Sequence, residues 1–195
     1  MRMHMSIHTR KLLHFLVLGL VVINLWIVVF YATDYIANND MARDLVGQFG
    51  YLGVLVISII AGLNIFVPIP AATFVPVFTA AGLLFPFIII ALVIGTTIAD
   101  IIGYFIGRWS KKLTEEHYPR TYSRMLFLNA EHNNLILPLV FIYAAFIPFP
   151  NEAIIIPLAL VGFRFHSLFI PLVLGTIVNQ TALAYGVVNI FALIF

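Results

Sequence analysis

The chain has 195 residues, of which 63% are hydrophobic and 9% charged, and its mean hydropathy is +1.09. A soluble domain of this size cannot hide so much apolar surface, so the composition predicts an integral membrane protein. The formal net charge of +2 says little about partners. The absence of cysteine excludes a disulfide framework and zinc–thiolate ligation, and no phosphate-binding or dinucleotide-binding motif is present, so we expect no metal, no cofactor and no nucleic-acid partner.

The first part of the chain, residues 1–50, predicts a membrane anchor followed by a segment at the membrane surface. Basic residues precede an apolar run over about 12–32, which is long enough to cross the ~30 Å hydrocarbon core. A signal peptide would have a shorter apolar stretch and a small-residue cleavage site, so we expect an uncleaved anchor with its N-terminus in the cytoplasm. Residues 33–50 are polar with apolar residues at helical spacing, which indicates a short interfacial helix.

Two stretches resemble each other at a fixed offset of 80 residues. Residues 66–96 and 146–176 align without a gap, and 10 of the 31 positions are identical, against about 3 expected from so apolar a composition. We interpret the pair as an internal repeat, with chance similarity as the alternative. In the first copy the identical positions are Phe66, Pro68, Pro70, Gly82, Phe85, Ile90, Leu92, Val93, Gly95 and Thr96.

Each repeat begins with an apolar stretch, 51–85 or 135–163, that prolines interrupt. A proline lacks an N–H and disfavours helix before it, so a pair of prolines one residue apart does not fit inside a straight helix. The arms of about 13 residues reach only ~20 Å, so we predict re-entrant hairpins whose tips need burial in protein or a wet cavity. The tips are Pro68 and Pro70 in the first repeat and Pro148 and Pro150 in the second.

A full span follows each hairpin, over 87–107 in the first repeat and about 168–190 in the second. Each repeat therefore crosses the membrane an odd number of times, and the second repeat must be inverted relative to the first. The polar linker 109–134 then shares the cytoplasmic side with the N-terminus. Nine of the ten lysines and arginines fall on that side, and only Arg43 falls outside.

The predicted fold is an all-α integral membrane protein of the cell (inner or plasma) membrane. An N-terminal transmembrane anchor and interfacial segment precede a membrane domain over 51–195. That domain holds two inverted repeats, about 51–108 and 135–190, each a re-entrant helical hairpin followed by a transmembrane helix. Within the first span, Ala99, Gly103 and Gly107 lie four residues apart and predict a face for close helix packing.

Two carboxyl groups lie within the apolar segments: Asp100 on the first span and Glu152 beside the second tip. A carboxyl group at membrane depth is functional by default, with a structural hydrogen bond as the alternative or, for Asp100, solvation near the interface. Desolvation favours the neutral acid, which suits a group that carries protons. Of the two, we expect Glu152 to be the main proton carrier, because the nearby helix break can offer it unpaired amides and water.

Further polar side chains accompany these acids along the apolar segments. The amides could hold a headgroup or an ion, or they could join helices. Arg164, at the cytoplasmic mouth of the second hairpin, could meet an anionic substrate or set the topology. The amide residues are Asn64, Asn151, Asn179 and Gln180, with Thr96 and Thr176 near them.

About residues 50–190 resemble the DedA family, also called the VTT or SNARE-associated Golgi protein domain. A fairly specific motif in the first span carries the resemblance, with a weaker match in the second hairpin. The resemblance implies a membrane protein that moves polyprenyl-phosphate or phospholipid, with proton coupling. The matching residues are Gly82, Gly95, Asp100, Tyr104, Gly107 and Arg108 in the first repeat, and Phe146, Ile147 and Pro148 in the second.

The sequence departs from the family pattern at the residues that would handle protons and phosphate. The family's first-hairpin glutamate falls on Ala72, and its two arginines fall on Ala145 and Asn151. Glu152 lies 80 residues after Ala72, so this chain has a glutamate at the repeat-equivalent position of the second hairpin. Without these arginines a phosphate headgroup loses its bidentate partners, so the resemblance supports the fold more than the substrate.

We expect a transporter or flippase-like protein that moves a lipid-linked or amphiphilic substrate with proton coupling, and not an enzyme. The partners implied are membrane lipids, a lipid-linked substrate, protons and a second copy of the chain. A structural or assembly subunit without transport activity is the alternative. A lipid-modifying enzyme is less favoured, because the sequence shows no nucleophile or metal cluster near the tips.

Overall fold

The computed structural model is helical, without strands, in the residues that it describes. These are 7–63, 70–120, 122–123, 126, 133–147 and 149–194; the side chains of 7–18, 22, 133–134 and 194 are not described. In chain order the helices are α1 (Ile7–Ala37), α2 (Asp40–Gly62), the 3₁₀ helix η1 (Ala71–Phe74), α3 (Val75–Ala80), α4 (Phe85–His117), α6 (Asn133–Phe146), α7 (Glu152–Val161) and α8 (Phe165–Ile194).

Several of these helices are long and apolar enough to cross a membrane. Their number and composition are those of a multi-pass membrane protein. Within the described residues, four are long and apolar enough to cross: Gly19–Ala37, Asp40–Gly62, Phe85–His117 and Phe165–Leu193. The remaining apolar helices are shorter, namely Ala71–Ala80, Leu135–Phe146 and Glu152–Val161. The prediction of an all-helical membrane protein is therefore confirmed.

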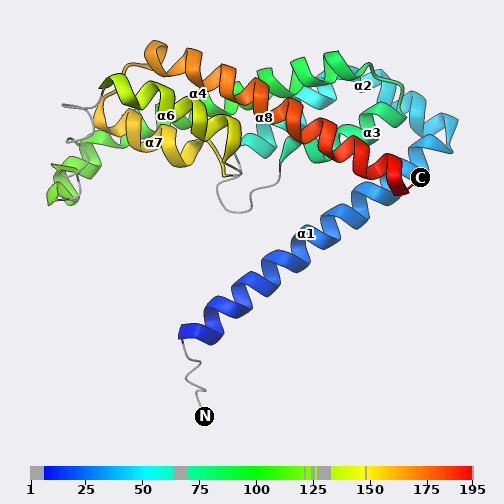
Figure 1. Cartoon of the computed structure of the whole chain (residues 1–195), viewed down its shortest axis with the longest axis horizontal. Helices are drawn as coiled ribbons and strands as arrows, with labels where there is room; N and C mark the ends of the chain where they lie inside the picture. Colours follow the sequence, from blue (N-terminus) through cyan, green and yellow to red (C-terminus); the bar gives the residue numbers. More distant parts are fainter. Residues whose placement is uncertain are drawn as a thin grey trace.

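The two long helices α4 and α8 form the central pair on which the other helices pack, and they run antiparallel along the long axis of the molecule (Figure 1). Phe85, at the start of α4, lies with its ring centroid 4.8 Å from that of Tyr185, late in α8. Tyr104, later in α4, lies 5.1 Å from Phe165, the first residue of α8. Shorter helices pack on this pair, with α2 and α7 against α4 and α6 against α8.

Helix α1 leaves the rest of the molecule at an angle and touches it only through its C-terminal half (Figure 1). Trp26 stacks on Phe191 near the end of α8, with ring centroids 5.9 Å apart. Val29 is buried in the same cluster, beside Val187. The N-terminal half of α1 extends away from the other helices, as expected of an anchor that lipid surrounds.

The 80-residue offset of the sequence repeat reappears in the order of the elements. Helix α4 begins at Phe85 and α8 begins at Phe165, which is 80 residues later. The turn before each helix contains a glycine with positive φ, +86° at Gly82 and +106° at Gly162. Residues with a side chain rarely adopt this backbone region, which explains why glycine stands at both places.

Small residues let neighbouring helices approach α4 closely. A Cβ added at Gly107 would collide with the backbone carbonyl of Ile156 in α7. A Cβ added at Gly62 in α2 would lie 2.6 Å from the Cβ of Ala99. The predicted packing role of the small-residue face is thus confirmed, with one end of the face against α2 and the other against α7.

Two boundaries differ from the sequence expectation. Helix α4 continues to His117, so the first part of the expected linker 109–134 is helical. The expected interfacial segment 33–50 is divided, because α1 runs to Ala37 and α2 begins after an Asn39 cap whose side chain accepts a hydrogen bond from Ala42 N. Polar residues mark membrane edges well but do not end a helix by themselves.

Helix α2 consists of two helical parts that meet at Gly50. This glycine has φ +47° and ψ −138°, which breaks the helix between residues 49 and 51. Met41, Leu45 and Phe49, before the break, are exposed apolar residues on a short helical segment. The twelve residues after the break, 51–62, lie against α4.

Candidate substrate-binding cavity

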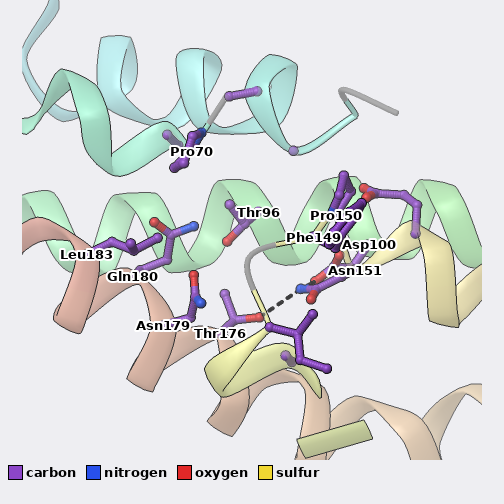
Figure 2. Close-up of a pocket in the computed structure, with 16 residues that line it drawn as sticks. Pro70, Thr96, Asp100, Phe149, Pro150, Asn151, Thr176, Asn179, Gln180 and Leu183 are labelled. Carbon is purple, nitrogen blue, oxygen red and sulfur yellow. Dashed lines mark hydrogen bonds between the residues drawn. The ribbon is translucent and has the colours of Figure 1, made fainter. Parts of the chain in front are cut away.

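Residues from the described parts of both predicted hairpin tips, 70–71 (the first break) and 149–151 (the second break), line one cavity of about 130 Å³ between α4 and α8. Ala71 and Pro70 come from the first break, and Phe149 and Pro150 from the second. Figure 2 shows Pro70 on one side of the cavity and Pro150 near Asp100 on another. The polar side chains in the lining are Thr96 and Asp100 of α4, Asn151 and Glu152 at the start of α7, and Thr176, Asn179 and Gln180 of α8.

The second break ends in a tight start to α7. Ala153 N donates to the Pro150 carbonyl at 3.1 Å, and Ile155 N donates to the Asn151 carbonyl at 2.9 Å. The Tyr143 hydroxyl of α6 donates to the same Pro150 carbonyl at 3.3 Å. These bonds satisfy backbone groups that the proline would otherwise leave unpaired in an apolar surrounding.

Asn151 links this break to both long helices. Its Nδ2 donates to Asp100 Oδ2 of α4 at 3.1 Å and to Thr176 Oγ1 of α8 at 3.3 Å (Figure 2). An amide nitrogen has two hydrogens, so one side chain can serve both acceptors. The amide therefore fixes the break between α4 and α8 and provides Asp100 with a donor.

Glu152 lies at the first position of α7 and is only 2% exposed. Its stem packs on Gly103, since a Cβ added at Gly103 would lie 3.0 Å from Glu152 Cγ. Both carboxyl oxygens are buried without a hydrogen-bond partner among the described residues. Burying an ionised carboxylate in this state is very costly, so the geometry suits a neutral acid or a carboxylate that meets a ligand.

Helix α8 contributes amides to the other side of the cavity. Gln180 is 7% exposed, and its Oε1 has no hydrogen-bond partner in the described part of the chain. Asn179 Nδ2 donates to the Ala145 carbonyl of α6 at 3.3 Å, which holds the end of α6 against α8. One amide is thus engaged in helix packing, and the other keeps a free acceptor.

The structure brings five of the predicted site residues together and leaves Arg164 apart. Arg164 is exposed in the turn between α7 and α8 and does not line the cavity. Asn64, Pro68 and Pro148 lie outside the described residues. The five residues in the cavity are Asp100, Asn151, Glu152, Asn179 and Gln180, together with the tip prolines Pro70 and Pro150.

The cavity lining also contains small and apolar residues that the sequence did not indicate as site residues. Gly62 lines the cavity at the end of α2, and Leu183 lines it one turn after Gln180. The spacing of three residues on α8 places Leu183 on the same face as Gln180, and this could have indicated it. Ala72, where the family acid falls, is fully buried in an apolar cluster and does not line the cavity.

The fold and the cavity define a multi-pass helical membrane protein with a largely apolar cavity between two long helices, into which two acids and several amides are set. A family model for the VTT domain matches residues 67–189, which is more than half of the chain. The chain therefore belongs to the VTT domain family, the DedA family, which is membrane-associated and transporter-like. Searches of curated proteins and of solved structures give no match.

Proposed function

We propose that this protein moves a lipid-linked or amphiphilic substrate across the cell membrane in exchange for, or together with, protons. The observation that carries the proposal is the pair of buried acids, Asp100 and Glu152, in one cavity that residues from both breaks line. Acids inside a membrane domain mark ion and proton pathways. Transporters place such sites near the membrane midplane, beside discontinuous helices.

The arrangement of the helices supports two inverted repeats. Helices α4 and α8 hold equivalent places in the sequence repeat, and they run antiparallel. Equivalent helices that cross a membrane in opposite directions are typical of inverted repeats, in which the substrate site lies between the two halves.

Short helices support re-entrant hairpins. Helix α7 has 10 residues and α6 has 14, so they reach about 15 Å and 21 Å. Residues 51–62 after the Gly50 break reach about 18 Å. All three are shorter than the ~30 Å hydrocarbon core, which supports segments that enter the membrane and turn back within it.

The two acids differ in their surroundings, and this difference supports different roles for them. Asn151 donates a hydrogen bond to Asp100, whereas no other residue in the described part of the chain donates one to Glu152. A buried carboxyl group that no other side chain holds keeps its oxygens open to a ligand or to water, which suits a proton carrier. Glu152 is therefore the principal proton carrier, and Asp100 is its auxiliary.

Reconstitution into proteoliposomes tests the proposal. The wild-type protein should move members of a panel of labelled lipids across the bilayer, and the flux should change with an imposed pH gradient. Glu152→Gln should fold normally but lose the response to the gradient, because glutamine keeps the shape and cannot ionise. Asp100→Asn should reduce the flux less.

Glu116→Gln is the matched control, because it makes the same chemical change at an exposed position near the end of α4. It should leave the flux and its pH response unchanged. An unaltered pH profile in Glu152→Gln would remove the proton role of this residue. The absence of flux from the wild-type protein for every lipid tested would favour a structural or assembly role.

A further inference from the structure

The cavity has an excess of hydrogen-bond acceptors. Both carboxyl oxygens of Glu152 and the amide oxygen of Gln180 are buried without a partner in the described part of the chain. Each of these side chains is more than nine-tenths buried, and each lines the cavity. Buried acceptors without donors are costly, so three unpaired oxygens in one cavity indicate a ligand that donates hydrogen bonds.

The charges in the cavity favour a positive ligand. Asp100 and Glu152 line it, and no lysine, arginine or histidine does so among the described residues. A phosphate group would meet two acids and, among the described residues, no arginine guanidinium group, which is the group that binds phosphate best. A primary ammonium group carries a positive charge that pairs with the Glu152 carboxylate and three N–H groups that can donate to unpaired oxygens of the cavity.

The size of the cavity excludes a bare metal ion as a good fit. Its volume of about 130 Å³ is roughly ten times the ~10–15 Å³ that admits one water molecule. The space therefore suits a headgroup of several atoms. Phe149 lines the cavity and is still largely exposed, so its ring offers an apolar surface that an acyl or alkyl chain can follow out of the cavity.

We propose that the cavity binds the primary ammonium headgroup of an amphiphile, with Glu152 as its counter-ion and Gln180 as a neutral acceptor. This inference rests on the proposed transport function and specifies its substrate class. A proton and the ammonium group would compete for the Glu152 carboxylate, so that loading one releases the other. The other titratable side chains that interact with Glu152 in the described residues are Asp100 of α4 and Tyr143 of α6, whereas α8 supplies amides and hydroxyls.

Binding to four probes with the same C18 tail tests the proposal without requiring transport. The purified protein in phosphatidylcholine nanodiscs is titrated with octadecylamine, octadecyltrimethylammonium, N-octadecylacetamide or octadecyl phosphate, and bound probe is counted by native mass spectrometry. Octadecylamine should bind best, and its binding should fall as pH is lowered because protonated Glu152 loses its charge. The trimethylammonium probe, which has charge but no N–H, should bind less well.

Two variants connect this preference to the cavity. Glu152→Gln should weaken octadecylamine binding by about tenfold or more, since it removes one partner of a buried charged hydrogen bond. Gln180→Leu should weaken it by a smaller factor. Glu116→Gln should bind like the wild type, and thermal unfolding shows whether each variant is folded.

The outcomes separate this inference from the proposed function. Equal binding of all four probes, or a preference for octadecyl phosphate, overturns the ammonium assignment even where lipid flux responds to pH. Displacement by sodium chloride, but not by matched choline chloride, assigns the site to sodium and also overturns it. Selective octadecylamine binding without any flux supports the headgroup site while contradicting the transport function.

Discussion

Gly103 and Gly107 have no side chain, and this lets α7 and Glu152 pack closely against α4 beside the cavity. At Gly103 the stem of Glu152 takes the space where a Cβ would stand. At Gly107 the backbone of α7 comes into direct contact with α4. The position of the buried acid therefore depends on glycines one and two turns after Asp100 on the same helix.

We predict that Gly107→Ala destabilises the protein by about 1–3 kcal/mol, the usual cost of adding a methyl group to a tightly packed interface. The added Cβ would collide with Ile156 and lie 3.0 Å from the Cβ of Ala159, so α7 must move away from α4. Gly186→Ala in α8 is the control, since nothing lies within 4 Å of its added Cβ. Thermal unfolding in detergent should show a lower midpoint for the first variant only; equal midpoints would contradict the tight contact.

Asn151 offers a second test at a single residue. Asn151→Ala removes the hydrogen bonds to Asp100 and Thr176, each of which contributes about 0.5–1.5 kcal/mol. We predict faster hydrogen exchange at the first amides of α7, measured by mass spectrometry, because the break loses its attachment to α4 and α8. Asn38→Ala is the control, since among the described residues its amide donates to Asp34 near the end of α1 and to no part of α4, α7 or α8. Unchanged exchange in α7 would show that the proline break is rigid without Asn151.

Among the elements, the helix breaks bring together parts of the chain that are far apart in sequence. Ala71 follows the first break and Phe149 belongs to the second, yet both line one cavity. The chain has no native cysteine, so any crosslink must form between the two cysteines that are introduced.

We predict that Ala71→Cys combined with Phe149→Cys forms a crosslink with a short thiol-reactive reagent. Leu84→Cys combined with Phe149→Cys should not, because Leu84 precedes α4 and lies about 24 Å along that helix from the level of Asp100. Band shifts after protease cleavage in the linker report the outcome. Crosslinking of the control pair and not of the test pair would mean that the breaks do not meet.

Much of the element order was predictable, because prolines and glycines mark the boundaries between helices in an otherwise apolar chain. Pro70 stands at the start of η1 and Pro150 directly before the Asn151 cap of α7, and Gly82 and Gly162 allow the turns that follow these segments. The end of α4 was not predictable in the same way, because the charged and polar residues up to His117 are good helix formers outside the membrane.

The candidate site could be predicted only in part. Asp100 and Glu152 stand out, because acids are rare in apolar segments. The role of Asn151 as a bridge depends on how α4 and α8 face each other, and no local pattern records that. Arg164 attracted attention by its charge alone, and the turn between α7 and α8 places it outside the cavity.

For the whole molecule, the packing of the long helices indicates which ends share a side of the membrane. Trp26 of α1 and Phe85 of α4 both lie beside the last part of α8, against Phe191 and Tyr185. From there α1 runs back toward the N-terminus, and α4 runs forward toward His117. The start of α1 and the end of α4 therefore point away from the C-terminal end of α8.

We predict that the N-terminus and the 109–134 linker are cytoplasmic and that the C-terminus lies on the opposite side. The tally of lysines and arginines and the packing of α1, α4 and α8 both lead to this topology. Reporter fusions at residues 120 and 195, active on one side of the membrane only, check it. Identical activity of the two fusions would contradict the inverted repeats.

The length of α4 has a practical consequence for imaging. Its 33 residues extend about 50 Å, while the hydrocarbon core is ~30 Å thick, so the helix continues beyond the lipid as an unbroken rod. From Arg108 to His117 no side chain is buried, and most are exposed, so this part of the helix is largely free of the other helices. A helical fiducial protein fused in register after His117 would turn rigidly with the cavity-lining part of α4, which gives a chain of only 195 residues a visible landmark for electron cryomicroscopy.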